Sequence, residues 1–219
     1  MSEEPSVFAP FLILLIFGIT AFVVIGFHRG KKKNRQIYLS AFSELIDIFQ
    51  PDGQTFTRIG GQVGHHAVFT FNGKKPISEI DATITLLPRH APLYLPISRL
   101  LMRSDRLFIT FYMRFSPPGE GHLVESSYDG FRGHEITNAA RLTREEVKWG
   151  GHAFCLYYDR ITMYDHLKRL LTDHPEPGAV KQIAVTADQK RGFVFMIPRI
   201  DAVKRDLEPV FRWIGRIME

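Results

Sequence analysis

Cysteine is almost absent from the sequence, because Cys155 is the only one in 219 residues. An internal disulfide is therefore excluded, and this cysteine usage fits a reducing cytoplasm. The sequence also lacks a GxSxG nucleophile motif and any recognisable pair of catalytic carboxylates. Cys155 stands in an apolar run, where a buried core thiol is the ordinary interpretation. We therefore expect a protein that is not an enzyme and that needs no cofactor.

The spacings that hold metal ions are also missing, and we predict no metal site. The nine histidines include no HExxH or H-x-H pattern, and there is no CxxC. His65 and His66 are adjacent, and His152 and Cys155 are three apart, so on strands each pair points to opposite faces. Residues 60–64, GGQVG, have the composition of a phosphate loop but lead into a β run, with no GKS or GKT after them. We expect a strand bend or bulge there.

Charge is absent from residues 7–27, VFAPFLILLIFGITAFVVIGF. These 21 residues would form a helix of about 31 Å, which matches the hydrocarbon thickness of a bilayer. The preceding residues 1–6 are acidic, and no small-residue cleavage pattern follows the apolar run, so a signal peptide fits poorly. We predict a transmembrane helix over residues 7–27.

A basic juxtamembrane segment, residues 28–35, follows the span, and no Lys or Arg precedes it. This asymmetry predicts residues 1–6 as a short external N-terminus and a cytoplasmic domain over 36–219, in the cell membrane. The segment also accounts for the chain's net charge of +5, and with the two acidic residues before the span it leaves +2 for the domain. The high isoelectric point is therefore weak evidence for nucleic acid, and we expect no specific DNA partner. The residues expected to hold topology and attract anionic lipid are Arg29, Lys31, Lys32, Lys33 and Arg35.

Hydrophobic periodicity predicts an α+β fold after the span. A helix continuing from the membrane over residues 34–50 should end at Pro51-Asp52-Gly53. Strands are expected at 63–71, 80–86, 106–115, 152–158, 183–186 and 192–197, and helices at 96–103 and 161–173. Loops too short for crossover helices join adjacent strands. They favour an α/β sandwich domain with a mixed or antiparallel sheet over a doubly wound parallel one.

Two further segments complete the expected domain. Residues 116–151 are rich in Gly, Pro and Ser, which predicts a long loop that is functional or mobile. The last helix has the clearest period in the chain, with Asp201 as its expected N-cap and Pro209 as a kink. Its apolar face is formed by Val203, Leu207, Val210, Phe211, Ile214, Ile217 and Met218.

Arg99 and Arg103 share one face of the helix expected at 96–103, and Arg106 follows closely. Such a cluster of one sign can neutralise phosphates without selecting bases, so it is the candidate contact for a ribosome or its RNA. The alternative is that these arginines only flank a turn and pair with Asp105 and solvent. The charges of the last helix alternate in sign and indicate an ordinary solvated face.

Several segments resemble the calumin family, the coiled-coil-domain-containing subunit of the PAT complex at the eukaryotic translocon. Residues 93–113, LYLPISRLLMRSDRLFITFYM, are similar to the family's helix, Ser/Asp turn and strand. Residues 163–189, MYDHLKRLLTDHPEPGAVKQIAVTADQ, resemble its helix, strand and Asp-Gln turn. GFVFMIP at 192–198 and DLEPVFRWIGRIM at 206–218 resemble its aromatic strand and a helix with a Leu-x-Pro step. The similar blocks cover about half of the chain, in the family's order and behind a transmembrane helix.

This resemblance implies a non-enzymatic factor in membrane-protein biogenesis, an adaptor or intramembrane chaperone subunit. Its implied partners are the ribosome, a SecY- or YidC-type translocon or insertase, and a small membrane protein. The family's long acidic luminal region and its charged coiled coil have no counterpart here, so luminal calcium binding is not implied. We expect a shortened prokaryotic, archaeal-like relative. The alternative is a membrane-anchored small-molecule- or lipid-binding or signalling scaffold domain that uses a cleft under residues 116–151.

Overall fold

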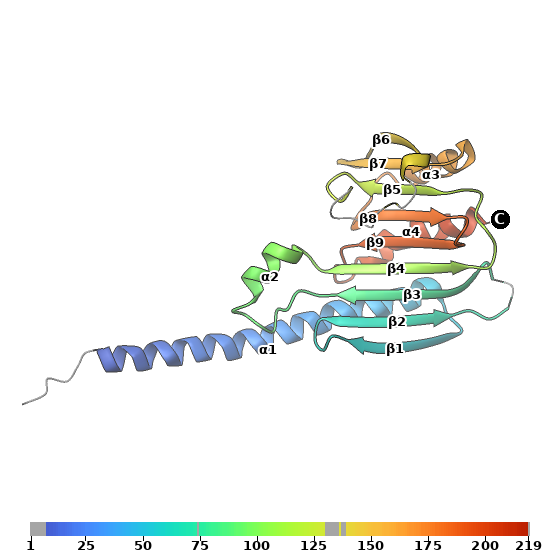
Figure 1. The fold of residues 1–219 in the computed structure, drawn as a ribbon. Helices are drawn as coiled ribbons and strands as arrows, with labels where there is room; N and C mark the ends of the chain where they lie inside the picture. Colours follow the sequence, from blue (N-terminus) through green and yellow to red (C-terminus); the bar gives the residue numbers. More distant parts are fainter. Residues whose placement is uncertain (1–7, 74, 130–135, 137–138, 219) are drawn as a thin grey trace, which may run out of the picture.

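The computed structural model describes residues 8–73, 75–129, 136 and 139–218. Within them a single nine-stranded sheet has the order β1-β2-β3-β4-β9-β8-β5-β7-β6 and is antiparallel at every strand pair. Three helices pack on one face of this sheet, and one of them projects far beyond it (Figure 1). The α+β prediction is confirmed, with an antiparallel rather than a mixed sheet.

The projecting helix is α1, Phe8–Phe49, whose 42 residues run without interruption from the apolar run into the domain. Described side chains in its first part, from Pro10 to Phe22, are all exposed. Its last part buries Ile37, Ala41, Leu45 and Phe49, which recur at intervals of four on one face. The expected continuation of the helix over residues 34–50 is therefore confirmed.

The strands next to α1 form a meander of four. β1 Gly53–Ile59, β2 Gly64–Thr70 and β3 Ile77–Thr85 pair in succession, and β3 pairs with β4 Arg106–Met113. Gly60 and Gly61 have φ of 71° and 69° and form the β1–β2 turn, where the sequence had indicated a bend or bulge. The short helix α2, Leu95–Met102, lies between β3 and β4 in the chain.

The other half of the sheet consists of β5 Gly121–Glu125, β6 Thr143–Trp149, β7 His152–Tyr158, β8 Val180–Thr186 and β9 Arg191–Met196. The expectation of one long loop over residues 116–151 is wrong, since β5 and β6 lie in it, with a short 3-10 helix at Ala139–Arg141. β5 lies between β8 and β7, and its short run, buried on both faces, shows no alternation. β6 is an edge strand with mostly exposed polar residues.

Helices α3 Ile161–Asp173 and α4 Val203–Arg216 complete the helical layer. Phe211 of α4 lies against Phe49 and Phe111, with ring centroids 5.0 and 6.1 Å apart, so α1, α4 and the sheet share one core. Asp201 is not the N-cap of α4, because the cap position is Ala202 and no side chain caps it. The backbone N–H of Asp201 instead donates to Ser40 Oγ at 2.9 Å, which ties the start of α4 to α1.

Candidate functional site

The chain folds back onto α1 at the end of the apolar run. The connection from β3 to α2 crosses α1 at two glycines one turn apart, Gly26 and Gly30. A Cβ at Gly26 would lie 2.8 Å from Cγ of Pro92, and a Cβ at Gly30 would overlap the carbonyl of Arg89. Two small residues four apart let the backbone approach a helix this closely. The position of α2 beside α1 therefore depends on these glycines.

A buried polar cluster fixes the same crossing. Asp105 accepts two hydrogen bonds of 2.8 Å from the guanidinium of Arg89 and another of 2.8 Å from the N–H of Leu87. Arg89 also donates to Asn34 Oδ1 at 3.0 Å, and Asn34 Nδ2 donates to the carbonyl of Leu87 at 2.9 Å. Asn34 and Asp105 are almost fully buried. The bidentate Arg89–Asp105 pair, with its further hydrogen bonds to Leu87 and Asn34, holds the β3–α2 connection firmly against α1.

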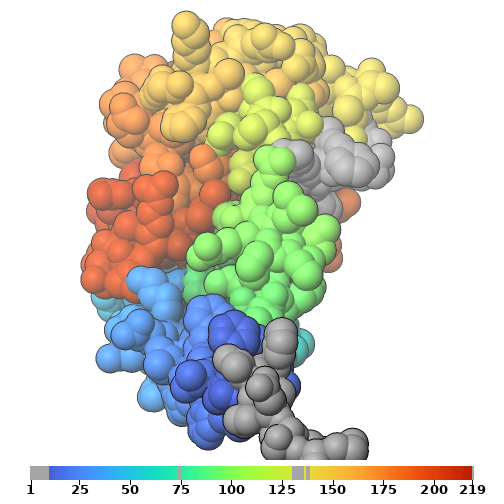
Figure 2. Space-filling view, turned by 90° about the vertical axis from the view of Figure 1, so that its left-hand side faces the viewer, coloured from blue at the N-terminus to red at the C-terminus, as the bar shows by residue number. Residues whose placement is uncertain are grey.

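Helix α2 presents an unusual surface. Ser98 is its only buried residue, whereas Leu93, Tyr94, Ile97, Leu100 and Leu101 are exposed. Ile97, Leu100 and Leu101 of the helix and Tyr94 at its N-cap fall on one side of it, and Leu93 lies in the turn just before. Figure 2 looks at the side of the molecule from which α1 projects, and the α2 segment (green) lies beside α1 (blue) on that side. The apolar periodicity was visible in the sequence, but only the fold shows that no described element covers it.

The predicted basic residues lie on two elements. Arg29, Lys31, Lys32, Lys33 and Arg35 are exposed on α1 just beyond the apolar run. Arg99 and Arg103 are exposed one turn apart, at the last turn and the C-cap of α2. Arg106 is half-buried at the start of β4, opposite Thr85. Asp105 pairs with Arg89 rather than with any of these three arginines, and none of them forms an ion pair with a described residue.

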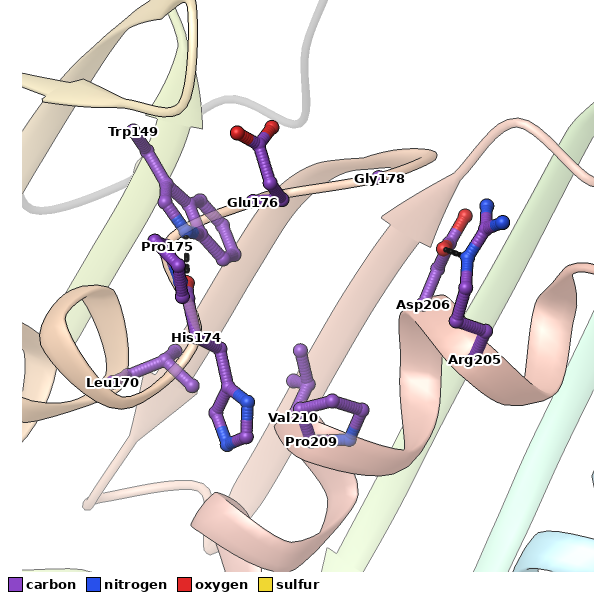
Figure 3. A pocket seen from close by; sticks show the side chains of 10 residues that line it. All are labelled: Trp149, Leu170, His174, Pro175, Glu176, Gly178, Arg205, Asp206, Pro209 and Val210. Atoms are coloured by element: carbon purple, nitrogen blue, oxygen red, sulfur yellow. Dashed lines mark hydrogen bonds and ion pairs between the residues drawn. The ribbon is translucent and has the colours of Figure 1, made fainter.

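A separate pocket of about 510 Å³ lies between the α3–β8 connection and α4 (Figure 3). The His174 ring points toward the Pro209–Val210 part of α4, while the Glu176 carboxylate points away from it. The side chains of Trp149, Arg205 and Asp206 in its wall already have structural partners. Trp149 Nε1 donates to the carbonyl of His174 at 2.6 Å, and Asp206 accepts from Arg205 Nε at 2.8 Å. Apart from the His174 ring and the Glu176 carboxylate, the pocket therefore offers a mainly apolar surface to a ligand.

A second groove, of about 420 Å³, runs between α1 and the β1–β2 hairpin. The ring of His65 stacks on Tyr38 there, with centroids 3.9 Å apart. Burial, and to a lesser extent the charge of Arg58, lowers the pKa of His65, which favours the neutral ring. His66 faces the other side of the sheet, where Nδ1 is 2.9 Å from Thr83 Oγ1. The adjacent histidines therefore point apart, as the strand period predicts.

Cys155 lies in a polar cluster on the sheet face opposite the helices. Arg144 Nη2 donates to Cys155 Sγ at 2.9 Å, and Tyr157 OH donates to Asp129 at 3.0 Å. Burial is the main cause that raises the pKa of the Cys155 thiol, and it also raises the pKa of Tyr157. Both groups therefore stay protonated at neutral pH, the opposite of what a thiolate nucleophile needs. The thiol is buried, as the sequence indicated, but in a polar rather than an apolar setting.

No group of three or more His, Cys, Asp or Glu side chains suited to a metal ion occurs among the described residues. The expected cleft under residues 116–151 stays a prediction, because residues 130–135, 137 and 138 of that segment lie outside the described residues. No model of a known protein family matches the chain, and no curated protein matches it.

Proposed function

We propose that this chain is a single-pass membrane-anchored adaptor, with its N-terminus outside and residues 36–219 in the cytoplasm. Among the described residues α1 alone is long and apolar enough to cross a membrane, and none of its apolar window is buried. The main observation in support is that α1 is one continuous helix, whose second half forms part of the domain core. If the apolar run were removed as a leader, the cleavage would fall within α1, whose second half the fold needs. The continuous helix therefore supports an anchor that is retained.

The basic residues support the proposed orientation. Five exposed Lys and Arg side chains follow the apolar run, and positive charge near a span stays on the cytoplasmic side. Buried Cys155 is a poor labelling site, so the test introduces an exposed cysteine by Arg169→Cys in α3. An impermeant maleimide should label it only after cells are opened, while a tag after Ser2 should be accessible in intact cells. Labelling of the introduced thiol in intact cells would contradict this orientation.

The adaptor role in membrane-protein biogenesis draws on the sequence resemblance and on the juxtamembrane surface. Arg99 and Arg103 are exposed and lack a described acidic partner. They belong to α2 and its C-cap, a segment on the side from which α1 projects. A ribosome or a SecY- or YidC-type insertase would meet the domain on this side or at its edges. Non-enzymatic action is part of the proposal, with the protonated state of Cys155 in its favour.

Native crosslinking and ribosome binding test this role together. Crosslinked membranes should yield ribosomal and insertase peptides; crosslinks to a metabolic enzyme complex instead would refute the adaptor. Arg99→Glu, Arg103→Glu and Arg106→Glu combined should weaken ribosome binding by the full chain and reduce its log–log salt slope by about 2 to 3. The matched control combines Arg160→Glu, Arg169→Glu and Arg191→Glu, which make the same charge change at exposed sites elsewhere. Equal binding by both variants would also refute the proposed contact.

The pocket between the α3–β8 connection and α4 favours a second candidate, an anchored small-molecule-binding domain. Its volume of about 510 Å³ lies in the range of ligand sites, and its wall includes Trp149 and Val210. His174→Trp would replace a half-buried ring that lines the pocket by a larger one and should fill it. A metabolite that raises the unfolding temperature of the parent but not of this variant would favour the second candidate.

A further inference from the structure

We propose that α2 is an interfacial helix whose apolar face lies in the cytoplasmic surface layer of the membrane. This inference rests on the proposed anchoring of α1, and it goes further by assigning a lipid contact to the folded domain. The surface concerned consists of Leu93, Tyr94, Ile97, Leu100 and Leu101, called here the α2 apolar face.

The first argument is the concentration of exposed apolar area. Beyond the apolar run, ten large hydrophobic side chains are exposed among the described residues, and five of them fall within the nine positions from Leu93 to Leu101. Their exposed fractions range from 50% to 80%. Scattered single apolar residues are ordinary on a protein surface, whereas a contiguous apolar patch marks a contact with a partner or a membrane. The α2 apolar face therefore requires an occupant.

The second argument is the position of α2 along α1, which identifies lipid as the occupant. Pro92 lies against Gly26, which belongs to the last turn of the apolar run, and the rings of Phe27 and His90 meet edge to face at 6.2 Å. The chain reaches the α2 apolar face within one residue of Pro92, so Leu93 starts about 3.8 Å away. If residues 7–27 fill the hydrocarbon layer, the start of α2 lies at its boundary. Figure 1 shows α2 beside α1, close to where the free part of that helix ends.

The third argument is that this position is fixed. Gly30 leaves no room between α1 and Arg89, and Arg89 is held by Asn34 and Asp105 through bonds of 2.8 to 3.0 Å. The connection cannot swing α2 away from the membrane without breaking these bonds. An apolar face held at this level meets lipid whenever α1 spans the bilayer.

The chemistry of α2 matches the interfacial layer. Helices that lie in this layer bury an apolar face about 5–10 Å deep and keep basic residues toward water. Around α2, Arg99 lies about 160° from Leu101 and about 100° from Leu100, outside the apolar face, and Arg103 follows at the C-cap. Tyr94 adds an aromatic ring with a polar tip, the type of side chain enriched at membrane interfaces. With the basic juxtamembrane segment close by, anionic headgroups would be attracted to this side of the domain.

The test uses the full chain reconstituted in vesicles of phosphatidylcholine and phosphatidylglycerol. An environment-sensitive fluorophore is attached to one introduced cysteine at a time, by Leu100→Cys, Arg99→Cys, Arg169→Cys or Ile16→Cys, all at exposed positions. The parent chain, whose only cysteine is buried, gives the labelling background. Lipids brominated at shallow or deep acyl positions then act as quenchers.

The proposal expects the probe at Leu100 to show a blue shift and a loss of emission, greater with shallow than with deep bromines. The probe at Arg99, which lies outside the α2 apolar face, should lose less emission, and the probe at Arg169 none. If the probe at Leu100 behaves like the one at Arg169 while the probe at Ile16 is quenched, α2 is in water. The interfacial assignment then fails, and the anchor stands.

Two other outcomes would also overturn the proposal. A blue shift at Leu100 without quenching, reversed by diluting the protein in lipid, would show that a second copy covers the α2 apolar face. An unquenched probe at Ile16 would show that α1 does not span the bilayer, so the anchoring and the interfacial helix would both be wrong.

Discussion

Replacing Gly30 by alanine provides a sharp test of how the domain is joined to α1. Alanine is normally the better helix residue, by about 0.8 to 1.0 kcal/mol in a helix interior. At Gly30 the added Cβ would overlap the carbonyl of Arg89, and that backbone cannot move freely. It belongs to the connection held by Asn34 and Asp105.

The two effects of Gly30→Ala oppose each other, and the steric effect is the larger. Overpacking a rigid site costs about 1 to 3 kcal/mol. Displacing Arg89 also weakens hydrogen bonds to a charged group, each worth about 1.5 to 3 kcal/mol. After the gain in helix propensity is subtracted, the free energy of unfolding should fall by about 2 kcal/mol or more.

Gly215→Ala is the matched control, since it makes the same change in a helix where nothing lies within 4 Å of the new Cβ. It should leave stability unchanged or raise it by up to about 1 kcal/mol. Urea unfolding of the full chain in detergent can be followed by tryptophan fluorescence, because both tryptophans, Trp149 and Trp213, are buried in the domain. Equal shifts of the two midpoints, in either direction, would refute the described packing of the β3–α2 connection on α1.

Three further substitutions test the core, the buried ion pair and the groove. Phe211→Ala removes a ring packed between two core aromatics and should cost about 3 kcal/mol, whereas exposed Arg212→Ala should stay within about 0.5 kcal/mol; equal midpoint shifts would contradict the described face of α4. Asp105→Ala leaves Arg89 without its carboxylate and should cost about 3 to 5 kcal/mol in urea unfolding; a near-neutral result would mean that the pair is not buried. Burial lowers the pKa of His65 from 6.5, so the unfolded chain takes up the proton first as pH falls, and stability should decline from pH 6.5 down to the folded pKa. His65→Gln should flatten the change in the urea midpoint between about pH 7.5 and about pH 5, and an unchanged slope would assign the pH dependence to other groups.

The elements predicted well from the sequence are those whose apolar period is long and one-sided. The helix expected at 161–173 and the strand expected at 152–158 have the bounds of α3 and β7. The last helix was found from its apolar face, although Trp213, which is buried and donates to the carbonyl of His166 at 2.8 Å, was not counted in that face. A one-sided period directly reflects burial against a single layer, so local sequence suffices.

The strands that the sequence did not predict, β1, β5 and β6, are those without a one-sided apolar period. Six of the seven residues of edge strand β1 are exposed, including Phe56, so its sequence shows little sign of which side faces the core. β5 is buried on both faces, and β6 is mostly polar, so neither alternates cleanly. Their assignment depends on neighbours distant in the chain, such as β8 beside β5. Turn-forming residues between β5 and β6 then gave residues 116–151 as a whole the sequence signature of a loop.

At the candidate site, too, local sequence predicts some features while others depend on the fold. The α2 apolar face is readable as a helical period, but its exposure depends on where the chain places α2. Asn34 and Arg89 are separated by 55 residues, and neither belongs to a motif that would pair them. The sequence therefore identified the basic residues near α2. It could not show that Asp105 pairs with Arg89, so that Arg99 and Arg103 remain exposed.

The continuity of α1 limits which surfaces can be functional. A flexible linker would let the domain sample many orientations relative to the apolar run, but here a helix extends from that run into the core. Gly30, the one glycine of α1 after the apolar run, is buried under the Arg89 connection, so it offers no hinge. Rotation about α1 is likewise opposed by packing against the sheet and α4. If α1 spans the membrane, the domain presents one side to it, and a cytoplasmic partner can approach Arg99 and Arg103 on that side, the edges at β1 and β6, or the pocket beside α4.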